Sequence, residues 1–264
     1  MSNPIALAVF DIDGVVRDVG GSYRRAIADT VEHFTQGRHR PTPTDLDQLK
    51  SEGIWNNDWK ASEELIKRYS QSTGIAYNTD YNSIVAYFQE RYRGTGEDPS
   101  QWNGYITQEP VLMSAQYLNE LQHGGVPSAF FSGATRGSAH YILQQRIGLQ
   151  NPILIAMGDA PSKPDPAGLY MTIQQLEEHT PPGLPVLYAG DTVADMATIT
   201  AARADFPERQ WFGVGVLPPH VQTEADYQTR YSETLEKAGA ALVIPHVEQL
   251  TVDAIQTLLG QKQP

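Results

Sequence analysis

The stretch Ile5-Ala-Leu-Ala-Val-Phe10, followed by Asp11-Ile-Asp13-Gly14, decides the fold expected of this chain. A short apolar run that ends in charge is typical of a buried parallel strand whose carboxyl end opens onto solvent. Open α/β sheets bind their ligands at that edge. Gly14 permits a sharp turn directly after the two aspartates, so both carboxylates can face one pocket. Two carboxylates this close repel each other unless a cation or a shared proton offsets the charge, so the pair predicts a metal site.

The composition narrows the classes of partner. The 264 residues include 19 Lys plus Arg and 31 Asp plus Glu, giving a formal charge of -12. This acidic excess argues against binding to nucleic acid or to an anionic membrane surface, and it favours small-molecule partners. There is no cysteine, which excludes disulfides, thiolate catalysis and cysteine-ligated metals. Without a basic leader or an apolar run of membrane length, we expect a soluble cytoplasmic protein. Nothing in the sequence indicates an oligomeric state.

The apolar pattern changes along the chain. Residues 21–105 are polar, rich in aromatic side chains and helical in period, whereas residues 1–20 and 106–264 alternate apolar strands with helices. This alternation predicts βαβ units and a doubly wound, Rossmann-like parallel sheet of the α/β class. We therefore expect a core built from 1–20 and 106–264, with an inserted all-helical domain over 21–105. The expected strands after the first are 128–131, 153–156, 186–189, 212–216 and 242–244, and the expected helices of the insert are 23–34, 45–52, 62–72 and 81–93.

Polar residues follow three further strands of the expected core. Ser132 and Gly133 end one strand and precede a helix, so the hydroxyl and nearby N–H groups can hold a phosphate oxygen. Lys163 stands in a Lys-Pro-Asp-Pro stretch, whose two prolines stiffen the chain around a cation. Asp191 ends another strand, and Asp195 follows it by about one helical turn. Taken singly, each is equally compatible with a turn, a helix cap or a surface lysine.

The four motifs in this order closely resemble the haloacid dehalogenase superfamily of phosphohydrolases. They are Asp-x-Asp-Gly from Asp11, the strand-ending Ser132, Lys-Pro-x-Pro from Lys163 and Gly-Asp-x-x-x-Asp from Gly190. The resemblance covers residues 6–244. The insert is similar in position and helical texture to the cap of the first subfamily, which contains phosphoglycolate phosphatases and β-phosphoglucomutase, and this implies that it governs substrate specificity.

The resemblance implies Mg²⁺-dependent hydrolysis of a small phosphorylated metabolite through an aspartyl-phosphate intermediate. In that scheme Asp11 is the nucleophile, and Asp13 is the general acid and then the general base. The resemblance further implies that Mg²⁺ is held by Asp11, by the main-chain carbonyl of Asp13 and by Asp191, since this ion prefers oxygen ligands.

The resemblance also assigns the groups around the phosphate. Ser132, N–H groups near Gly133, and Lys163 would bind the transferring phosphoryl oxygens, where charge stabilisation matters most. Asp195 would support the site by orienting Lys163 or a metal-bound water.

One stretch of the insert stands out as a candidate specificity loop. Gly53-Ile-Trp55-Asn56-Asn57-Asp58-Trp59-Lys60 combines two indoles, two amides and a carboxylate. Cap loops of the resembled subfamily reach the active site, whereas packing inside the insert is an equally good explanation for the tryptophans. A carboxylate facing the substrate favours a cationic or polyhydroxylated leaving group. Histidinol phosphate, sugar phosphates and phosphoglycolate all stay open as substrates.

Other functions are weighed against the same residues. A dehalogenase on this fold has no use for Asp13, because no alkoxide leaves. A phosphomutase keeps all four motifs, although Gly190 stands where the resembled mutase has Glu, which slightly favours hydrolysis. A catalytically silent binding protein would lack the nucleophile, and Asp11 is present. The seven histidines show no spacing typical of a zinc site.

Overall fold

The computed structural model describes residues 3–55, 57–77 and 79–260, and within these the chain divides into two compact units. The first consists of residues 1–18 and 111–264, and the second of residues 19–110. Sequence patterns put the corresponding boundaries at 20/21 and 105/106. Tyr105 belongs to the second unit because its hydroxyl donates to the Asp29 carboxylate at 2.7 Å.

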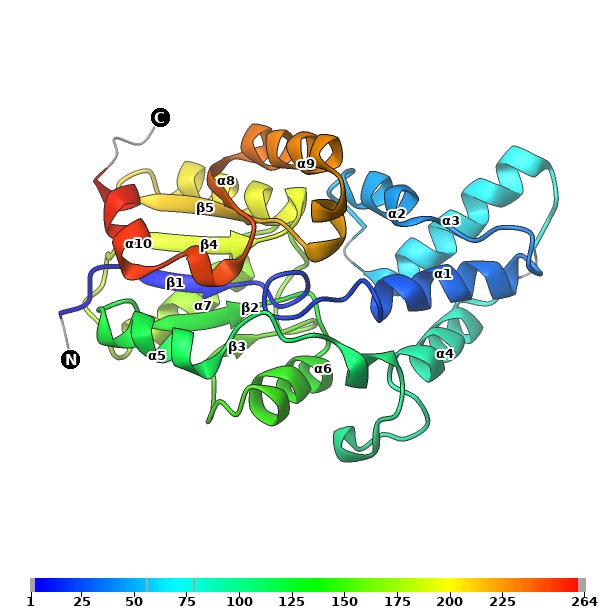
Figure 1. Ribbon diagram of the computed structural model, residues 1–264, viewed down its shortest axis with the longest axis horizontal. Coiled ribbons are helices and arrows are strands. Elements are labelled where there is room, and N and C mark those ends of the chain that lie inside the picture. The colour runs from blue at the N-terminus through cyan, green and yellow to red at the C-terminus, as the bar shows by residue number, and fades with distance from the viewer. Residues whose placement is uncertain (1–2, 56, 78, 261–264) are drawn as a thin grey trace. The chain divides into compact units, whose positions relative to one another are not determined.

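The first unit is a parallel α/β sheet of the expected class (Figure 1). Among the described residues, six strands lie in the order β3-β2-β1-β4-β5-β6. This order puts β1 at the centre, with β2 and β4 as its neighbours. The strands are β1 (Leu7–Phe10), β2 (Ser128–Phe131), β3 (Leu154–Ile155), β4 (Val186–Gly190), β5 (Trp211–Val216) and β6 (Ala240–Ile244).

Helices cover both faces of the sheet because its strands are apolar on both sides. Side chains alternate along a strand, so Ala8 and Phe10 of β1 enter one core cluster and Leu7 and Val9 enter another. The first cluster packs under α5 (Ala115–His123), α6 (Arg136–His140), the π-helical turn η3 (Tyr141–Arg146) and α10 (Val252–Leu259). The second packs under α7 (Ala167–Glu177) and α8 (Val193–Asp205), while α9 (Ala225–Ala238) packs near the β6 edge.

The strand register brings the expected site residues to one edge. Phe10 is paired with Phe130 on one side and with Ala189 on the other. The residues that follow these positions therefore emerge together at the carboxyl edge of the sheet, which is where such folds bind ligands. The short segments η4 (Pro219–Thr223) and η5 (Val247–Gln249) follow β5 and β6 at the same edge.

The second unit is helical throughout its regular structure. Its helices are α1 (Tyr23–Phe34), α2 (Pro43–Lys50), α3 (Asp58–Thr73) and α4 (Tyr81–Tyr92), followed by the short η1 (Pro99–Gln101) and η2 (Tyr105–Gln108). Helix α1 packs against both α3 and α4. Helix α3 begins four residues earlier than the apolar period predicts, because Asn57 caps it by accepting from the N–H groups of Trp59 and Lys60. Within the described residues of the whole chain, no helix is long and apolar enough to cross a membrane.

Candidate active site

The first carboxylate of the site is held by the central strand. Asp11 directly follows β1, its N–H donates to the Ala189 carbonyl at 2.8 Å, and its side chain is buried. Gly14 then turns the chain with φ at +79°. A Cβ on Gly14 would lie 2.1 Å from Asp191 Oδ2, so glycine is needed here for space as well as for conformation. The turn thus brings the loop after β1 into contact with the loop after β4.

A lysine stands at the centre of the site. Lys163 Nζ lies 2.9 Å from Asp11 Oδ1 and 2.6 Å from Asp195 Oδ1. The ammonium also lies over the rings of Phe131 and Tyr188, 5.2 and 5.4 Å from their centroids. Two carboxylates and two aromatic faces compensate the charge of this buried cation.

Asp195 contacts the lysine, and both of its carboxylate oxygens accept hydrogen bonds. Oδ1 contacts Lys163 and accepts a hydrogen bond from the Tyr188 hydroxyl at 2.8 Å. Oδ2 accepts from the main-chain N–H and the hydroxyl of Thr192, at 3.0 and 2.6 Å. Thr192 and Asp195 form a capping box that starts α8. One side chain therefore both caps the helix and holds the lysine.

The acidic cluster is suited to a cation. Oxygens of Asp11, Asp191 and Asp195 all lie within 4.8 Å of one another, and all three residues are buried. Asp11 Oδ1 makes the ion pair with Lys163 but has no hydrogen bond of acceptable geometry. Because Asp195 has used both oxygens, Asp11 and Asp191 are the members best placed to coordinate an added ion.

The electrostatics follow from burial and like charge. Burial raises the pKa of Asp11 to about 6, with Lys163 opposing the rise and the neighbouring Asp195 and Asp13 adding to it. Burial also disfavours the charge on Asp195, yet Lys163 and the capping hydrogen bonds outweigh it and hold the pKa of Asp195 below its ordinary value. For Lys163 the two carboxylates outweigh burial, so its pKa is raised and it stays a cation.

Ser132 lies beside β1 at the end of β2. It is buried, its N–H donates to the Ile155 carbonyl at 3.0 Å, and its hydroxyl accepts from the Ala134 N–H at 3.2 Å. Gly133, the next residue, is exposed. The first unit therefore contains Asp11, Ser132, Lys163, Asp191 and Asp195 on the segments that follow four neighbouring strands of one sheet.

Asp13 has a partner that sequence patterns do not identify. Arg17 Nε donates to Asp13 Oδ1 at 2.7 Å, and Nη2 lies 2.6 Å from the same oxygen. The Arg17 side chain is fully buried and Asp13 is 22% exposed. The cation four residues after Asp13 is the only signal in the sequence, and it is a weak one because the intervening turn, not a helix, brings them together. Tyr188 is likewise missed, since it is indistinguishable from a core aromatic on β4.

Three residues of the expected specificity loop have partners within the second unit. Trp55 Nε1 donates to Glu52 Oε2 at 2.6 Å, and Asn57 caps α3. Lys50 Nζ donates to Asp58 Oδ1 at 2.8 Å, so that carboxylate already has a cation. Asn56 lies outside the described residues.

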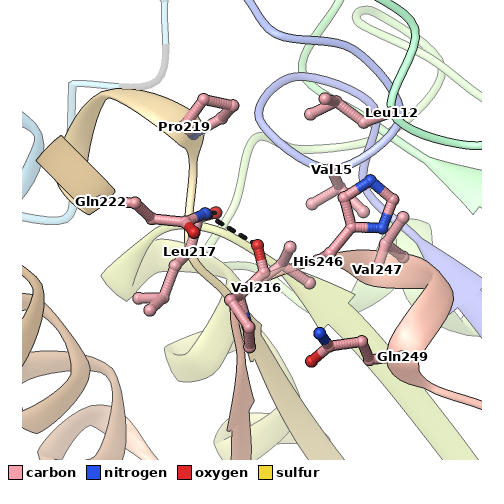
Figure 2. Close-up of a pocket in the computed structure, with 10 residues that line it drawn as sticks. Val15, Leu112, Val216, Leu217, Pro219, Gln222, His246, Val247 and Gln249 are labelled. Atoms are coloured by element: carbon pink, nitrogen blue, oxygen red, sulfur yellow. Dashed lines mark hydrogen bonds between the residues drawn. The ribbon is translucent and has the colours of Figure 1, made fainter.

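A separate pocket opens at the same edge of the first unit (Figure 2). It has a volume of about 400 Å³ and is mainly apolar, with Val15 and Leu112 on one side and Leu217 and Pro219 on the other. Gln222 closes one end by donating to main-chain carbonyls of Leu217 and Pro245. None of the acidic cluster, Ser132 or Lys163 lines it, so this pocket is separate from the candidate active site.

Comparison with known proteins identifies the family. The family model of haloacid dehalogenase-like hydrolases matches residues 5–203, so the chain belongs to that family. This agrees with the resemblance carried by the four motifs. A protein named imidazoleglycerol-phosphate dehydratase from Phytophthora nicotianae is 28% identical over an alignment of 253 residues that covers 92% of this chain and 51% of that protein. The chain thus spans about half the length of this curated relative.

Solved structures show the same fold. A phosphonoacetaldehyde hydrolase-like protein from Oleispira antarctica has a TM-score of 0.67 at 15% identity, covering 99% of this chain and 96% of that one. A family hydrolase from Deinococcus radiodurans with bound phosphate and sodium has a TM-score of 0.61 at 19% identity, covering 99% and 100%. Phosphatase Tt82 from Thermococcus thioreducens has a TM-score of 0.59 at 19% identity, covering 86% and 99%.

Proposed function

We propose that this hydrolase is a Mg²⁺-dependent phosphomonoesterase that acts on a small phosphorylated metabolite through an aspartyl-phosphate. The observation that carries the proposal is Lys163, a buried cation that contacts Asp11 and Asp195 inside a cluster of three carboxylates. A fixed cation beside a buried nucleophile suits a transferred group that carries negative charge. Membership of the hydrolase family and the fold shared with a phosphatase are consistent with it.

The donor set fits Mg²⁺. Asp11 Oδ1 is a buried carboxylate oxygen in an ion pair with Lys163, and burial, with the neighbouring Asp195 and Asp13 charges, raises the pKa of Asp11. A divalent cation would offset this cost of holding Asp11 as a carboxylate. Asp11 and Asp191, with the main-chain carbonyl of Asp13, would supply the oxygen ligands that this ion prefers. The bound ion would neutralise charge on the phosphoryl oxygens and on the nucleophile.

The proposed reaction has two steps, and Asp11 and Asp13 act in both. A carboxylate oxygen of Asp11 forms a bond to phosphorus while the bond from phosphorus to the ester oxygen breaks, and Asp13 gives its proton to the departing oxygen. In the second step Asp13 takes a proton from the attacking water, the bond between Asp11 and phosphorus breaks, and inorganic phosphate leaves. Ser132, N–H groups near Gly133, and Lys163 would hold the phosphoryl oxygens throughout.

We assign substrate choice to the second unit, residues 19–110, acting as a cap. Its stretch around Trp55, Asn57 and Asp58 combines aromatic and polar groups suited to a metabolite headgroup. Because Lys50 already compensates Asp58, a polyhydroxylated or zwitterionic headgroup fits better than a simple cation. The name of the Phytophthora relative adds phosphorylated imidazole compounds to the substrates worth testing.

A panel of phosphate monoesters tests the proposal. The panel contains phosphoglycolate, sugar phosphates, histidinol phosphate, imidazoleglycerol phosphate and 4-nitrophenyl phosphate, each assayed for phosphate release with and without Mg²⁺. Asp11→Asn serves as the blank, and we expect it to lose at least about 1000-fold in kcat. Release of no phosphate from any compound by the wild type would overturn the proposal. Isomerisation of a sugar phosphate without phosphate release would assign a mutase instead.

A further inference from the structure

The turn after β1 brings a buried arginine onto the second aspartate. The Arg17 N–H donates to the Ile12 carbonyl at 3.2 Å, and the Arg17 carbonyl accepts from the Gly14 N–H at 2.9 Å. This closed turn puts Asp13 and Arg17 side by side, although neither lies in a helix. The Arg17 side chain is fully buried, and its Nε and Nη2 lie 2.7 and 2.6 Å from the same oxygen, Asp13 Oδ1.

The guanidinium also contacts a different element. Nη2 donates to Ser138 Oγ at 2.9 Å, and Nη1 donates to the Ser138 carbonyl at 3.5 Å. Ser138 lies in α6, the helix that follows Ser132, and is itself buried. Arg17 therefore links the loop of the two aspartates to the helix that follows Ser132. The rigid fork of an arginine makes such a link geometrically specific, because its donors keep fixed directions.

We propose that Arg17 is a positioning residue for proton transfer by Asp13, and that Ser138 positions Arg17 in turn. This inference rests on the proposed phosphomonoesterase function. Since Arg17 supplies N–H donors to Oδ1, that oxygen acts as an acceptor, and the transferable proton is carried by Oδ2. When the bond from phosphorus to the ester oxygen breaks, the proton passes from Oδ2 to the departing oxygen. When water attacks the aspartyl-phosphate, Oδ2 takes the proton back.

The positioning role differs from a purely structural one in its dependence on the leaving group. A leaving group of low pKa, such as 4-nitrophenolate, departs without much help from an acid, whereas an alkoxide needs the proton. Loss of Asp13 alignment therefore lowers turnover of an alkyl phosphate far more than turnover of 4-nitrophenyl phosphate. A variant that merely reduces the folded fraction lowers both by the same factor.

The test compares kcat/KM of Arg17→Lys and Arg17→Met on 4-nitrophenyl phosphate, phenyl phosphate and an alkyl phosphate that the wild type hydrolyses. We expect the loss to be about 10- to 100-fold greater for the alkyl phosphate, a part of the roughly 100- to 10,000-fold that acid catalysis contributes. Ser138→Ala is expected to show the same trend at about 2- to 5-fold, and it carries the test if the Arg17 variants do not fold. In an Asp13→Asn background, Arg17→Lys should add no further dependence on the leaving group.

A matched control lies at the opposite edge of the sheet. Arg209 is also ion-paired, with Nη2 2.9 Å from Glu177 Oε1 and Nε donating to the Leu184 carbonyl at 2.7 Å, and its side chain is 15% exposed. Arg209→Lys is expected to leave the ratio between substrates unchanged. Equal losses on all substrates in both the Arg17 and the Ser138 variants would overturn the positioning role while leaving the phosphatase intact. A wild type inert towards every monoester would overturn the function itself.

Discussion

The hydroxyl of Tyr188 donates to Asp195 Oδ1, 2.8 Å away, on the same oxygen that contacts Lys163. Tyr188 is fully buried on β4, and its ring lies beneath the lysine ammonium. This contact connects the candidate site to the core, because Tyr188 packs within the sheet and also fixes the orientation of the Asp195 carboxylate. A hydrogen bond to a charged acceptor of this kind contributes about 1.5–3 kcal/mol.

Tyr188→Phe should therefore weaken catalysis without removing any group that touches substrate. We expect kcat to fall about 5- to 30-fold, because Asp195 loses one of the contacts that hold Lys163 in place. The matched control is Tyr170→Phe, which deletes a hydroxyl that donates to Asp205 at 2.8 Å on an exposed surface. The test is to measure kcat of both variants on one substrate by steady-state kinetics. Equal kcat values for the two variants would contradict the role of Tyr188.

Asp11→Asn should stabilise the metal-free protein at neutral pH. The pKa of Asp11 is about 6 in the folded protein against an ordinary value of 3.8, so the folded state binds this proton more tightly than the unfolded state does. Stability from this group is present below about pH 4 and is lost as the pH rises to about 6, a difference of up to about 3 kcal/mol. In EDTA we expect the free energies of unfolding to coincide near pH 4, and the variant to be more stable at pH 7.5.

A carboxylate with the opposite shift provides the control. Hydrogen bonds from Thr42 lower the pKa of Asp45 in the capping box of α2. Its stability contribution is present above the unfolded pKa and is lost as the pH falls, so Asp45→Asn should be less stable than the wild type at pH 7.5. Denaturant unfolding in EDTA measures both variants. A loss of stability in Asp11→Asn at pH 7.5 would show that the Asp11 charge is already compensated without a metal.

Gly14→Ala should damage metal binding beyond its effect on stability. Gly14 has φ at +79°, and an added Cβ would lie 2.1 Å from Asp191 Oδ2, so the Asp191 carboxylate must move. Gly148 has φ at +88° with no atom within 4 Å of an added Cβ, so Gly148→Ala isolates the conformational cost of about 1–2 kcal/mol. We expect only Gly14→Ala to raise the Mg²⁺ concentration for half-maximal activity, by at least about 10-fold. Activity titrations with Mg²⁺ test this, and equal curves would place Asp191 outside the metal site.

Substitutions in the second unit should affect substrates selectively. Trp55→Ala and Asp58→Ala are expected to raise KM for the best metabolite of the panel about 10-fold, and KM for 4-nitrophenyl phosphate less than about 2-fold, because only the metabolite has a headgroup to contact. Asp80→Ala, which removes the N-cap of α4 in the same unit, controls for loss of local stability. If KM changed equally for both substrates, the stretch at 53–60 would have a structural role only.

Much of the fold could be predicted because its signals are local. The strand at 128–131 has the expected bounds, and the strand expected at 186–189 extends one residue further, since apolar runs with polar ends mark buried parallel strands. The π-helical turn η3 has no such local signal, because apolar periodicity does not distinguish it from the α-helix α6 that precedes it.

Only those residues of the candidate site that belong to sequence motifs could be predicted. Asp11 and Asp191 follow strand ends and Asp195 lies in the first turn of the next helix, and the sheet brings such residues together. The partners Arg17 and Tyr188 could not be found, because a contact through a turn or through the core depends on geometry that residue spacing does not encode.

The capping box at Thr192 and Asp195 couples the start of helix α8 to the compensation of the Lys163 charge, because the Asp195 carboxylate takes part in both. Opening the first turn of α8 releases the Asp195 carboxylate from Thr192 and loosens its hold on Lys163. The amide of Asp195, which donates to the Thr192 side chain at 3.3 Å, is consequently expected to report on the proposed phosphate site. Hydrogen exchange at this one amide can follow ligand occupancy in solution without any label on the substrate.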